Sequence, residues 1–259
     1  MKGIVISNNP HIAALHTFFR HQQTADFVFR GESHDFYELV YVNEGRAGIT
    51  ADHRVFELEA GQAFLHPPMQ FHAIYGLNEP FTYTIITFSG TDIPKTNDRV
   101  CRPSEPAAME HLYQLGKQRF LTTPYWIKEA TDPLPFVKEL ERFLLLLQPE
   151  EKRRTKSQSA LNYASIIRTL QQNLHRRLTV REVAKLCNMS EINLQKTFAR
   201  YAGVGIMDYF NRIKMQEAVR LLQTGLSVKE TALQLGYTDQ NYFSTAFKRI
   251  TGQTPSRYK

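Results

Sequence analysis

The sequence predicts a chain of more than one domain, with an all-β barrel followed by helices in the first part and an all-α second part. Its 259 residues suffice for two ordinary domains. Residues 1–150 carry 13 Lys and Arg against 18 Asp and Glu, a net charge of −5, whereas residues 151–259 carry 19 against 7, a net +12. We therefore expect only the second part to meet a polyanion, the alternative being a solvated basic surface.

Short apolar stretches separated by turn-forming residues fill the region from residue 27 to residue 89. Several short strands at close spacing are typical of a small barrel or sandwich. The expected strands are FYELVYV (36–42), ITADHRVFEL (49–58), GQAFLHP (61–67) and FTYTIITF (81–88). After residue 104 the pattern becomes helical.

Two segments of this region resemble the two sequence motifs of the cupin family. The matching residues are His34, Glu38 and Gly45 in the first motif, and Gly61, Pro67 and His72 in the second. Glu32 replaces the first histidine of the family, and Met69 replaces a usual glycine. The resemblance implies a cupin-like barrel.

Four polar residues of these motifs are candidates for a ligand pocket: Glu32, His34, Glu38 and His72. Alternate residues of a strand face the same side, so the first three can point into a barrel. Two histidines with carboxylates suit a divalent metal. The alternative is a metal-free pocket of hydrogen-bonded residues, and we expect this alternative, with no cofactor. A small barrel can hold one small ligand.

A helix and a linker mark the boundary between the two parts. In FVKELERFLLLL (136–147), the residues that share a face are Phe136, Leu140, Phe143, Leu144 and Leu147. This face serves either a dimer interface or packing against the barrel. Charged, proline-containing sequence without apolar residues follows it. We predict a cupin-like first domain at 1–150, a linker at 151–159 and a second domain at 160–259.

The second part contains the same local pattern twice, in TVREVAKLCNMS (179–190) and SVKETALQLGYT (227–238). Thr179 with Glu182, and Ser227 with Glu230, have the spacing of capping boxes, which begin helices. Each short helix is followed by a tight turn, an N-cap (Ser190 or Asp239) and a second helix. The sequence therefore predicts two helix-turn-helix units, at 180–201 and 228–250.

The second helix of each unit has an exposed polar face. Hydrogen-bonding side chains can read bases there, and basic ones can neutralise phosphates, although any solvated helix is polar outside. A helix over about 206–222, roughly 25 Å long, connects the units. The expected base contacts are Ile192, Gln195, Lys196, Gln240, Asn241, Ser244 and Thr245, and the expected phosphate contacts are Arg200, Lys248 and Arg249.

Residues 160–259 resemble the DNA-binding domain of the AraC/XylS family of transcription regulators. The resemblance is carried by LTVREVAKLCNMSEINLQKTFARYAG, by NRIKMQEAVRLL and by SVKETALQLGYTDQNYFSTAFKRITGQTPSRYK. It implies that the second helix of each unit enters the major groove of double-stranded DNA. Thr245 stands where many members have Arg, which puts guanine readout there in doubt. The resemblance also implies a cupin-like domain that senses a small molecule, such as a sugar, a homodimer, and contact with RNA polymerase.

We therefore expect a ligand-responsive, sequence-specific transcription regulator and not an enzyme, with the sign of regulation open between activation and repression. Two alternatives stay open: a metal-dependent cupin enzyme with a basic tail, and a constitutive DNA-binding regulator whose barrel is purely structural. Two cysteines, Cys101 and Cys187, suggest no disulfide framework, and no run of about 18 apolar residues exists to span a membrane. A cytoplasmic location fits these features.

Overall fold

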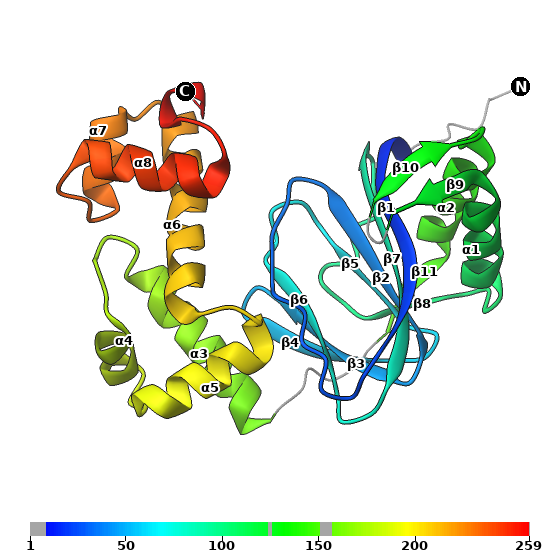
Figure 1. Ribbon diagram of the computed structural model, residues 1–259, viewed down its shortest axis with the longest axis horizontal. Coiled ribbons are helices and arrows are strands. Elements are labelled where there is room, and N and C mark those ends of the chain that lie inside the picture. The colour runs from blue at the N-terminus through cyan, green and yellow to red at the C-terminus, as the bar shows by residue number, and fades with distance from the viewer. Residues whose placement is uncertain (1–8, 124–125, 151–156, 259) are drawn as a thin grey trace, which may run out of the picture. The chain divides into compact units, whose positions relative to one another are not determined.

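Two separate units make up the chain, assigned to residues 1–156 and 157–259 (Figure 1). The computed structural model describes residues 9–123, 126–150 and 157–258. Most of the linker expected at 151–159 lies outside the described residues. Its last two residues belong to a helix that begins at Gln158. Ser157 is the N-cap of this helix and accepts a hydrogen bond from the backbone N–H of Ala160 at 3.2 Å.

The N-terminal unit is built mainly from two antiparallel sheets. One has the strand order β1-β7-β2-β5-β8-β11 and the other the order β4-β3-β6, while β9 and β10 pair separately. The elements are β1 His11–Gln23, β2 Tyr37–Glu44, β3 Arg46–Ala51, β4 Arg54–Glu59, β5 Ala63–His66, β6 His72–Gly76, β7 Phe81–Thr91, β8 Cys101–Pro103, α1 Ala108–Arg119, β9 Phe120–Thr122, β10 Ile127–Ala130, α2 Leu134–Leu146 and β11 Leu147–Pro149.

The six-stranded sheet is buried on both faces because its strands alternate between two hydrophobic clusters. On β2, Val40 and Val42 belong to an inner cluster that both sheets share. Leu39 and Tyr41 point to the opposite face, where α1 and α2 cover the sheet. Alternation along an extended strand produces this division.

The apolar face of α2 packs against this outer side of the sheet. Phe136, Leu140, Phe143 and Leu144 are all buried in the outer cluster. The sequence left two uses open for these four residues, a dimer interface or packing against the barrel. The structure shows packing against the barrel, so these residues are not available to a partner chain.

One strand prediction was wrong, and one strand was missed. Residues 49–58 form a hairpin, β3 and β4, because Asp52 adopts a left-handed φ of 50° and its carboxylate accepts the backbone N–H of Phe71 at 3.1 Å. Strand β1 was not predicted. It pairs along β7 with register shifts between Ile12 and Ala14 and between Leu15 and Thr17, and such bulges disrupt the alternation on which prediction depends.

The C-terminal unit consists of helices packed around α6. The aromatic ring of Tyr209 on α6 lies 5.3 Å from that of Phe198 in the first helix-turn-helix unit. Further along α6, Met215 and Ala218 share a core with Phe243 and Phe247 of the second unit. In Figure 1, α5 lies against one end of α6 and α8 against the other. The helices are α3 Gln158–Gln172, α4 Val180–Leu186, α5 Glu191–Ala202, α6 Ile206–Gln223, α7 Val228–Gln234 and α8 Gln240–Thr251, followed by a 3-10 helix, Pro255–Tyr258.

A buried lysine of α6 is hydrogen-bonded to the segment before the first helix-turn-helix unit and to the second unit. The side chain of Lys214 is 3% exposed, and its Nζ donates to the carbonyl of Arg176 at 2.6 Å and to that of Leu235 at 2.8 Å. Burial, assisted by the nearby charge of Arg177, lowers the pKa of Lys214 from 10.5 to about 8. The hydrogen bonds link the segment before α4 with the end of α7.

We predict that the stability of the C-terminal unit rises with pH through Lys214. Between pH 8 and pH 10.5 the unfolded chain binds this proton and the folded chain does not, so raising the pH favours the folded state. Urea unfolding of the wild type and Lys214→Met at several pH values measures the effect. The difference in unfolding free energy should be constant below about pH 8 and should shift in favour of the wild type above it. A difference that does not change with pH would contradict this.

Candidate nucleic-acid interface and barrel site

The first helix-turn-helix unit is defined by its caps. Thr179 and Glu182 form the predicted capping box: the backbone N–H of Thr179 donates to the Glu182 carboxylate at 2.7 Å, and the N–H of Glu182 donates to the Thr179 hydroxyl at 3.3 Å. The turn uses Asn188 at a φ of 53°. Ser190 caps α5, which ends at Gly203 in the left-handed conformation. These contacts fix both ends of both helices.

The second helix-turn-helix unit has the same kinds of capping contacts and turn. Ser227 and Glu230 form a capping box, with distances of 2.8 and 3.2 Å. Gly236 provides the left-handed turn, and a Cβ there would lie 2.5 Å from the carbonyl oxygen of His175. Asp239 caps α8, and its carboxylate accepts the N–H of Tyr242 at 2.8 Å. The two capping boxes confirm the helix starts predicted from the sequence.

Burial of the apolar face determines which side chains of α5 and α8 are exposed. Leu194 and Phe198 are fully buried on α5, as are Phe243 and Phe247 on α8. The expected base-contacting residues consequently lie on the outer faces. Ile192, at 67% exposure, is the most exposed large apolar residue among those described. The other exposed members are Gln195, Lys196, Gln240, Asn241 and Thr245, while Ser244 is half-buried.

Two hydroxyls of α8 are already bonded to the helix. The Ser244 hydroxyl donates to the carbonyl of Gln240 at 2.8 Å, and the Thr245 hydroxyl donates to that of Asn241 at 3.0 Å. Such bonds to the preceding turn use the only hydroxyl proton. In this state Thr245 presents a methyl group and an acceptor to a ligand, so Gln240 and Asn241 are the stronger candidates for hydrogen-bond donation from α8.

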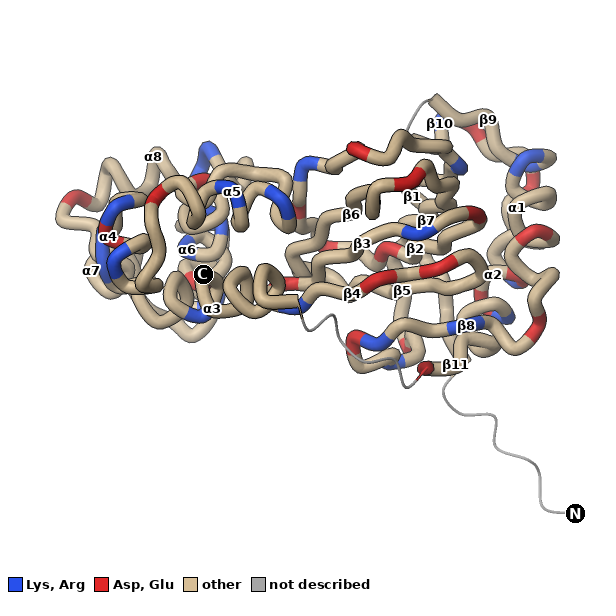
Figure 2. Tube along the Cα trace, turned by 90° about the horizontal axis from the view of Figure 1, so that it is seen from below, with Lys and Arg blue, Asp and Glu red and all other residues tan. Residues whose placement is uncertain are grey.

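Basic residues lie on and beside these helices. Arg200, Lys248 and Arg249, the expected phosphate contacts, are all exposed. Lys248 and Arg249 border a shallow hollow at the end of α8, together with Ser244, Thr245, Gly252 and Thr254. Figure 2 shows Lys and Arg on several helices of this unit, α4 and α5 among them. The basic residues of this unit are therefore distributed over several helices.

One aromatic residue of this surface was not predicted from the sequence. Tyr242 on α8 is 57% exposed, and the guanidinium of Arg177 lies 5.6 Å from its ring centre. An exposed tyrosine next to an arginine can contact sugar or base edges. The apolar stretch YF obscured Tyr242, because only Phe243 faces the core.

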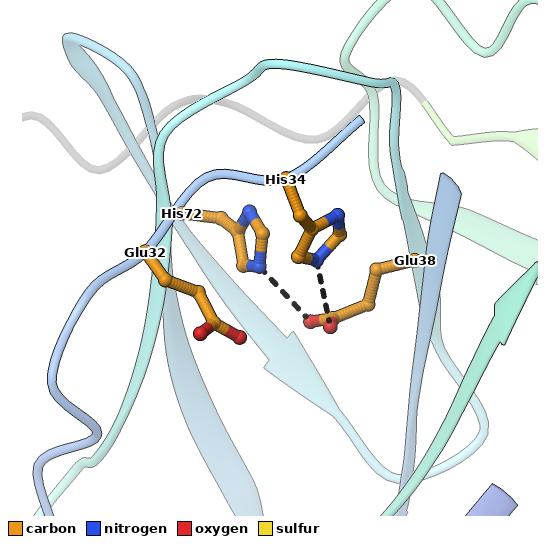
Figure 3. A group of neighbouring side chains, drawn as sticks. All are labelled: Glu32, His34, Glu38 and His72. Atoms are coloured by element: carbon orange, nitrogen blue, oxygen red, sulfur yellow. Dashed lines mark ion pairs between the residues drawn. The ribbon is translucent and has the colours of Figure 1, made fainter. Parts of the chain in front are cut away.

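The four pocket candidates of the N-terminal unit lie together (Figure 3). Glu38 is on β2 and His72 on β6, while Glu32 and His34 lie in the segment before β2. Glu32 pairs with His72 through both backbone N–H groups, at 3.0 and 2.9 Å. One ligand atom from each side chain lies within 4.8 Å of the others, and in the described part of the chain these residues are a group able to hold a metal ion.

The electrostatics of this group centre on Glu38. The Nε2 atoms of His34 and His72 lie 3.6 and 3.5 Å from its carboxylate oxygens. Burial raises the pKa of Glu38, but the neighbouring histidines, His72 foremost, outweigh it and hold the pKa far below its usual range. Burial lowers the pKa of His72, but Glu38 outweighs it and leaves the pKa raised. Glu38 is therefore ionised, and the histidines beside it stabilise its buried charge.

A third histidine adjoins the site and was not among the predicted residues. His66, on β5, is 1% exposed; its ring stacks on His72 at 4.6 Å, and its Nδ1 lies 2.7 Å from the side-chain oxygen of Gln70. Burial, together with the charge of His72, lowers the pKa of His66 to about 3, so it is neutral at physiological pH. It lies inside the second cupin-like segment, where the motif gives it no role.

Comparisons with known proteins agree with both parts of this description. The family model described as "Helix-turn-helix domain" matches residues 183–259, and the model described as "AraC-like ligand binding domain" matches residues 15–115. The chain belongs to the AraC family of transcription regulators. This AraC-family chain is a DNA-binding transcription regulator, and its N-terminal domain is of the AraC-like ligand-binding type.

Two relatives of this AraC-family regulator align over most of its length. The Msm operon regulatory protein of Streptococcus mutans is 26% identical over 238 residues, 87% of this chain and 84% of the relative. The transcriptional activator RhaR of Salmonella schwarzengrund is 25% identical over 248 residues, 90% of this chain and 87% of the relative. The crystal structure of ToxT from Vibrio cholerae aligns with a TM-score of 0.39 and 16% identity, over 94% of this chain and 96% of that one. None of the helices in the described ranges has the length and apolar character needed to cross a membrane.

We predict that Asn241 contributes to base discrimination by this AraC-family regulator and that the Thr245 hydroxyl does not. Asn241→Ala should cost about 1–3 kcal/mol of discrimination at one base pair. Thr245→Val keeps the methyl group and removes a hydroxyl whose proton is bonded to the helix, so its effect should stay within about 0.5 kcal/mol. Binding of both variants to a selected site and to its single-base variants measures this. A larger loss for Thr245→Val would assign its hydroxyl a direct role.

Proposed function

We propose that α5 and α8 read bases in two successive segments of the DNA major groove. Two observations support this: α5 and α8 lie at opposite ends of α6 (Figure 1), and both have exposed polar residues on their outer faces. The 18 residues of α6 span about 27 Å, and successive entries to the major groove on one side of DNA are about 34 Å apart. Modest bending of the DNA would accommodate the difference.

The residues of this interface divide into two roles under the proposal. The exposed polar residues of the two helices contact bases, with Ile192 placed to touch a thymine methyl. The basic residues Arg200, Lys248 and Arg249 neutralise phosphates and supply affinity without sequence preference. Residues 160–259 thus act as the DNA-binding domain and residues 1–150 as the sensor.

We propose that the sensor binds a small-molecule effector at the group formed by Glu32, His34, Glu38 and His72. Buried carboxylate and imidazole groups are suited to the hydroxyls of a sugar, which is the effector class that the family resemblance suggests. The effector regulates only if it binds one arrangement of the protein more tightly than another. The chain is proposed to have no enzymatic activity, in keeping with relatives that are named regulators.

We propose further that the regulator acts as a homodimer in the cytoplasm and activates transcription through RNA polymerase. The relative RhaR is named an activator. On α2, Leu134 and Leu145 are 58% and 54% exposed and lie eleven positions apart, which places them on one helix face outside the core. This exposed face of α2 is the part of the helix available to a second copy.

Replacing Gln195 and Arg200 should separate base reading from charge neutralisation. Gln195→Ala should reduce binding to the selected site by about 1–3 kcal/mol and leave binding to random DNA almost unchanged. Arg200→Ala should weaken binding to both and reduce the salt dependence by about one phosphate contact. Sites are first selected from random DNA, and affinities are then measured at several salt concentrations. Equal losses of Gln195→Ala on both DNAs would remove it from the base-reading set.

A thermal-shift screen of sugars and small organic acids tests the effector site. A true effector should raise the unfolding temperature of the wild type, since it binds only the folded state. His34→Ala should lose this increase, and His111→Ala, an exposed histidine on α1, should keep it. If no compound of either class changes the unfolding temperature, the purely structural role of the barrel becomes the better explanation.

A further inference from the structure

In the group formed by Glu32, His34, Glu38 and His72, hydrogen-bond acceptors face one another without an N–H donor between them. The Nδ1 atoms of His34 and His72 lie 3.0 Å from the backbone carbonyls of Phe36 and Gln70. A carbonyl oxygen only accepts, so each Nδ1 donates its N–H. In a neutral imidazole the lone pair is then on Nε2. Both Nε2 atoms face the carboxylate of Glu38, which when ionised is also only an acceptor.

These two Nε2 atoms are buried without a hydrogen-bond partner among the described residues. Their distances to the oxygens of Glu38, 3.5 and 3.6 Å, exceed the range of about 2.7–3.2 Å for N–H···O bonds. They match the spacing of two ligands around one tetrahedral metal, which is about 3.3–3.6 Å for bonds of about 2.0–2.2 Å. The geometry is therefore better suited to a shared cation than to direct hydrogen bonds.

Glu32 is the fourth candidate metal ligand. It lies beside His72, held by two backbone hydrogen bonds, and its carboxylate oxygen is within 4.8 Å of the other ligand atoms. Glu32 occupies the position of the first histidine in the cupin-like motif and supplies oxygen in place of nitrogen. Two imidazoles and two carboxylates form a donor set for Zn²⁺, Mn²⁺, Fe²⁺ or Co²⁺, without the sulfur that Cu⁺ prefers.

We propose that Glu32, His34, Glu38 and His72 bind one divalent first-row transition-metal ion. The N–H of each histidine is fixed by a backbone carbonyl, as is usual for metal-ligating histidines. Glu38 belongs to the six-stranded sheet, His72 to the three-stranded sheet, and the other two ligands to the segment before β2. The ion thus connects three parts of the sensor. This departs from the metal-free pocket expected from the sequence. It concerns the same four residues as the proposed effector site and does not depend on the identity of the effector.

A proton is the competing occupant. If His72 were protonated at Nε2, the imidazolium would neutralise Glu38, and the raised pKa of His72 is compatible with this. A proton on His72, however, leaves the Nε2 of His34 without a hydrogen-bond partner among the described residues. The two occupants are distinguished by titration with metal.

The test uses the full-length chain, stripped of metal with EDTA and titrated with Co²⁺. The visible absorption of bound Co²⁺ should saturate at one ion per chain, and Zn²⁺ should displace it. Glu38→Gln and His72→Ala should weaken binding at least about tenfold, and Glu32→Gln should also weaken it. His111→Ala, which changes an exposed histidine of α1, should bind Co²⁺ like the wild type. Far-UV circular dichroism shows that each variant is folded.

The outcomes separate the proposals. Absence of a saturable cobalt spectrum in folded wild-type protein would overturn the metal site and favour the proton. Unchanged binding by His72→Ala and Glu32→Gln would also overturn it, because the ion would then lie elsewhere. DNA binding by the stripped protein is measured in parallel. If it persists while cobalt binding fails, only the metal proposal is lost; if DNA binding fails and cobalt binds, only the base-reading proposal is lost.

Discussion

Helix α6 is the constraint on which the DNA-binding surface depends. It packs against Phe198 at one end and against the core of Phe243 and Phe247 further along, so it belongs to the hydrophobic core of both helix-turn-helix units. A single helix with two such contacts cannot bend without losing burial at one of them. Apolar packing therefore sets the orientation of α5 relative to α8. The outward polar side chains do not contribute to this orientation and can vary with the DNA sequence that they contact.

In the sensor, the same alternation that forms the core also creates the polar site. Positions 38, 40 and 42 of β2 share one face, and Val40 and Val42 point into the inner cluster. Glu38 must follow them inward, because a shift of one residue in register would expose the whole apolar set. The register of β2 thus buries the carboxylate of Glu38. The histidines around it offset the free-energy cost of removing its charge from water.

The C-terminal unit was largely predictable because its determinants are local. Thr179 with Glu182, and Ser227 with Glu230, mark helix starts within four residues, and Leu194 with Phe198 fixes the buried face. The N-terminal unit was less predictable, since the bulges of β1 and the turn at Asp52 depend on partner strands distant in sequence. The four pocket residues were found from spacing. The roles of their ring nitrogens were not, because these depend on the backbone carbonyls of Phe36 and Gln70.

The hydrogen bonds of Lys214 have a consequence for the operators that this regulator can use. One amine holds the backbone at Arg176, before the first unit, and at Leu235, within the second. Together with the packing of α6 against Phe198, Phe243 and Phe247, these bonds restrict changes in the distance and the angle between α5 and α8. One inserted base pair between the two contacted segments rotates the second by about a tenth of a turn. Natural sites should therefore vary in sequence far more readily than in the length of their central spacer.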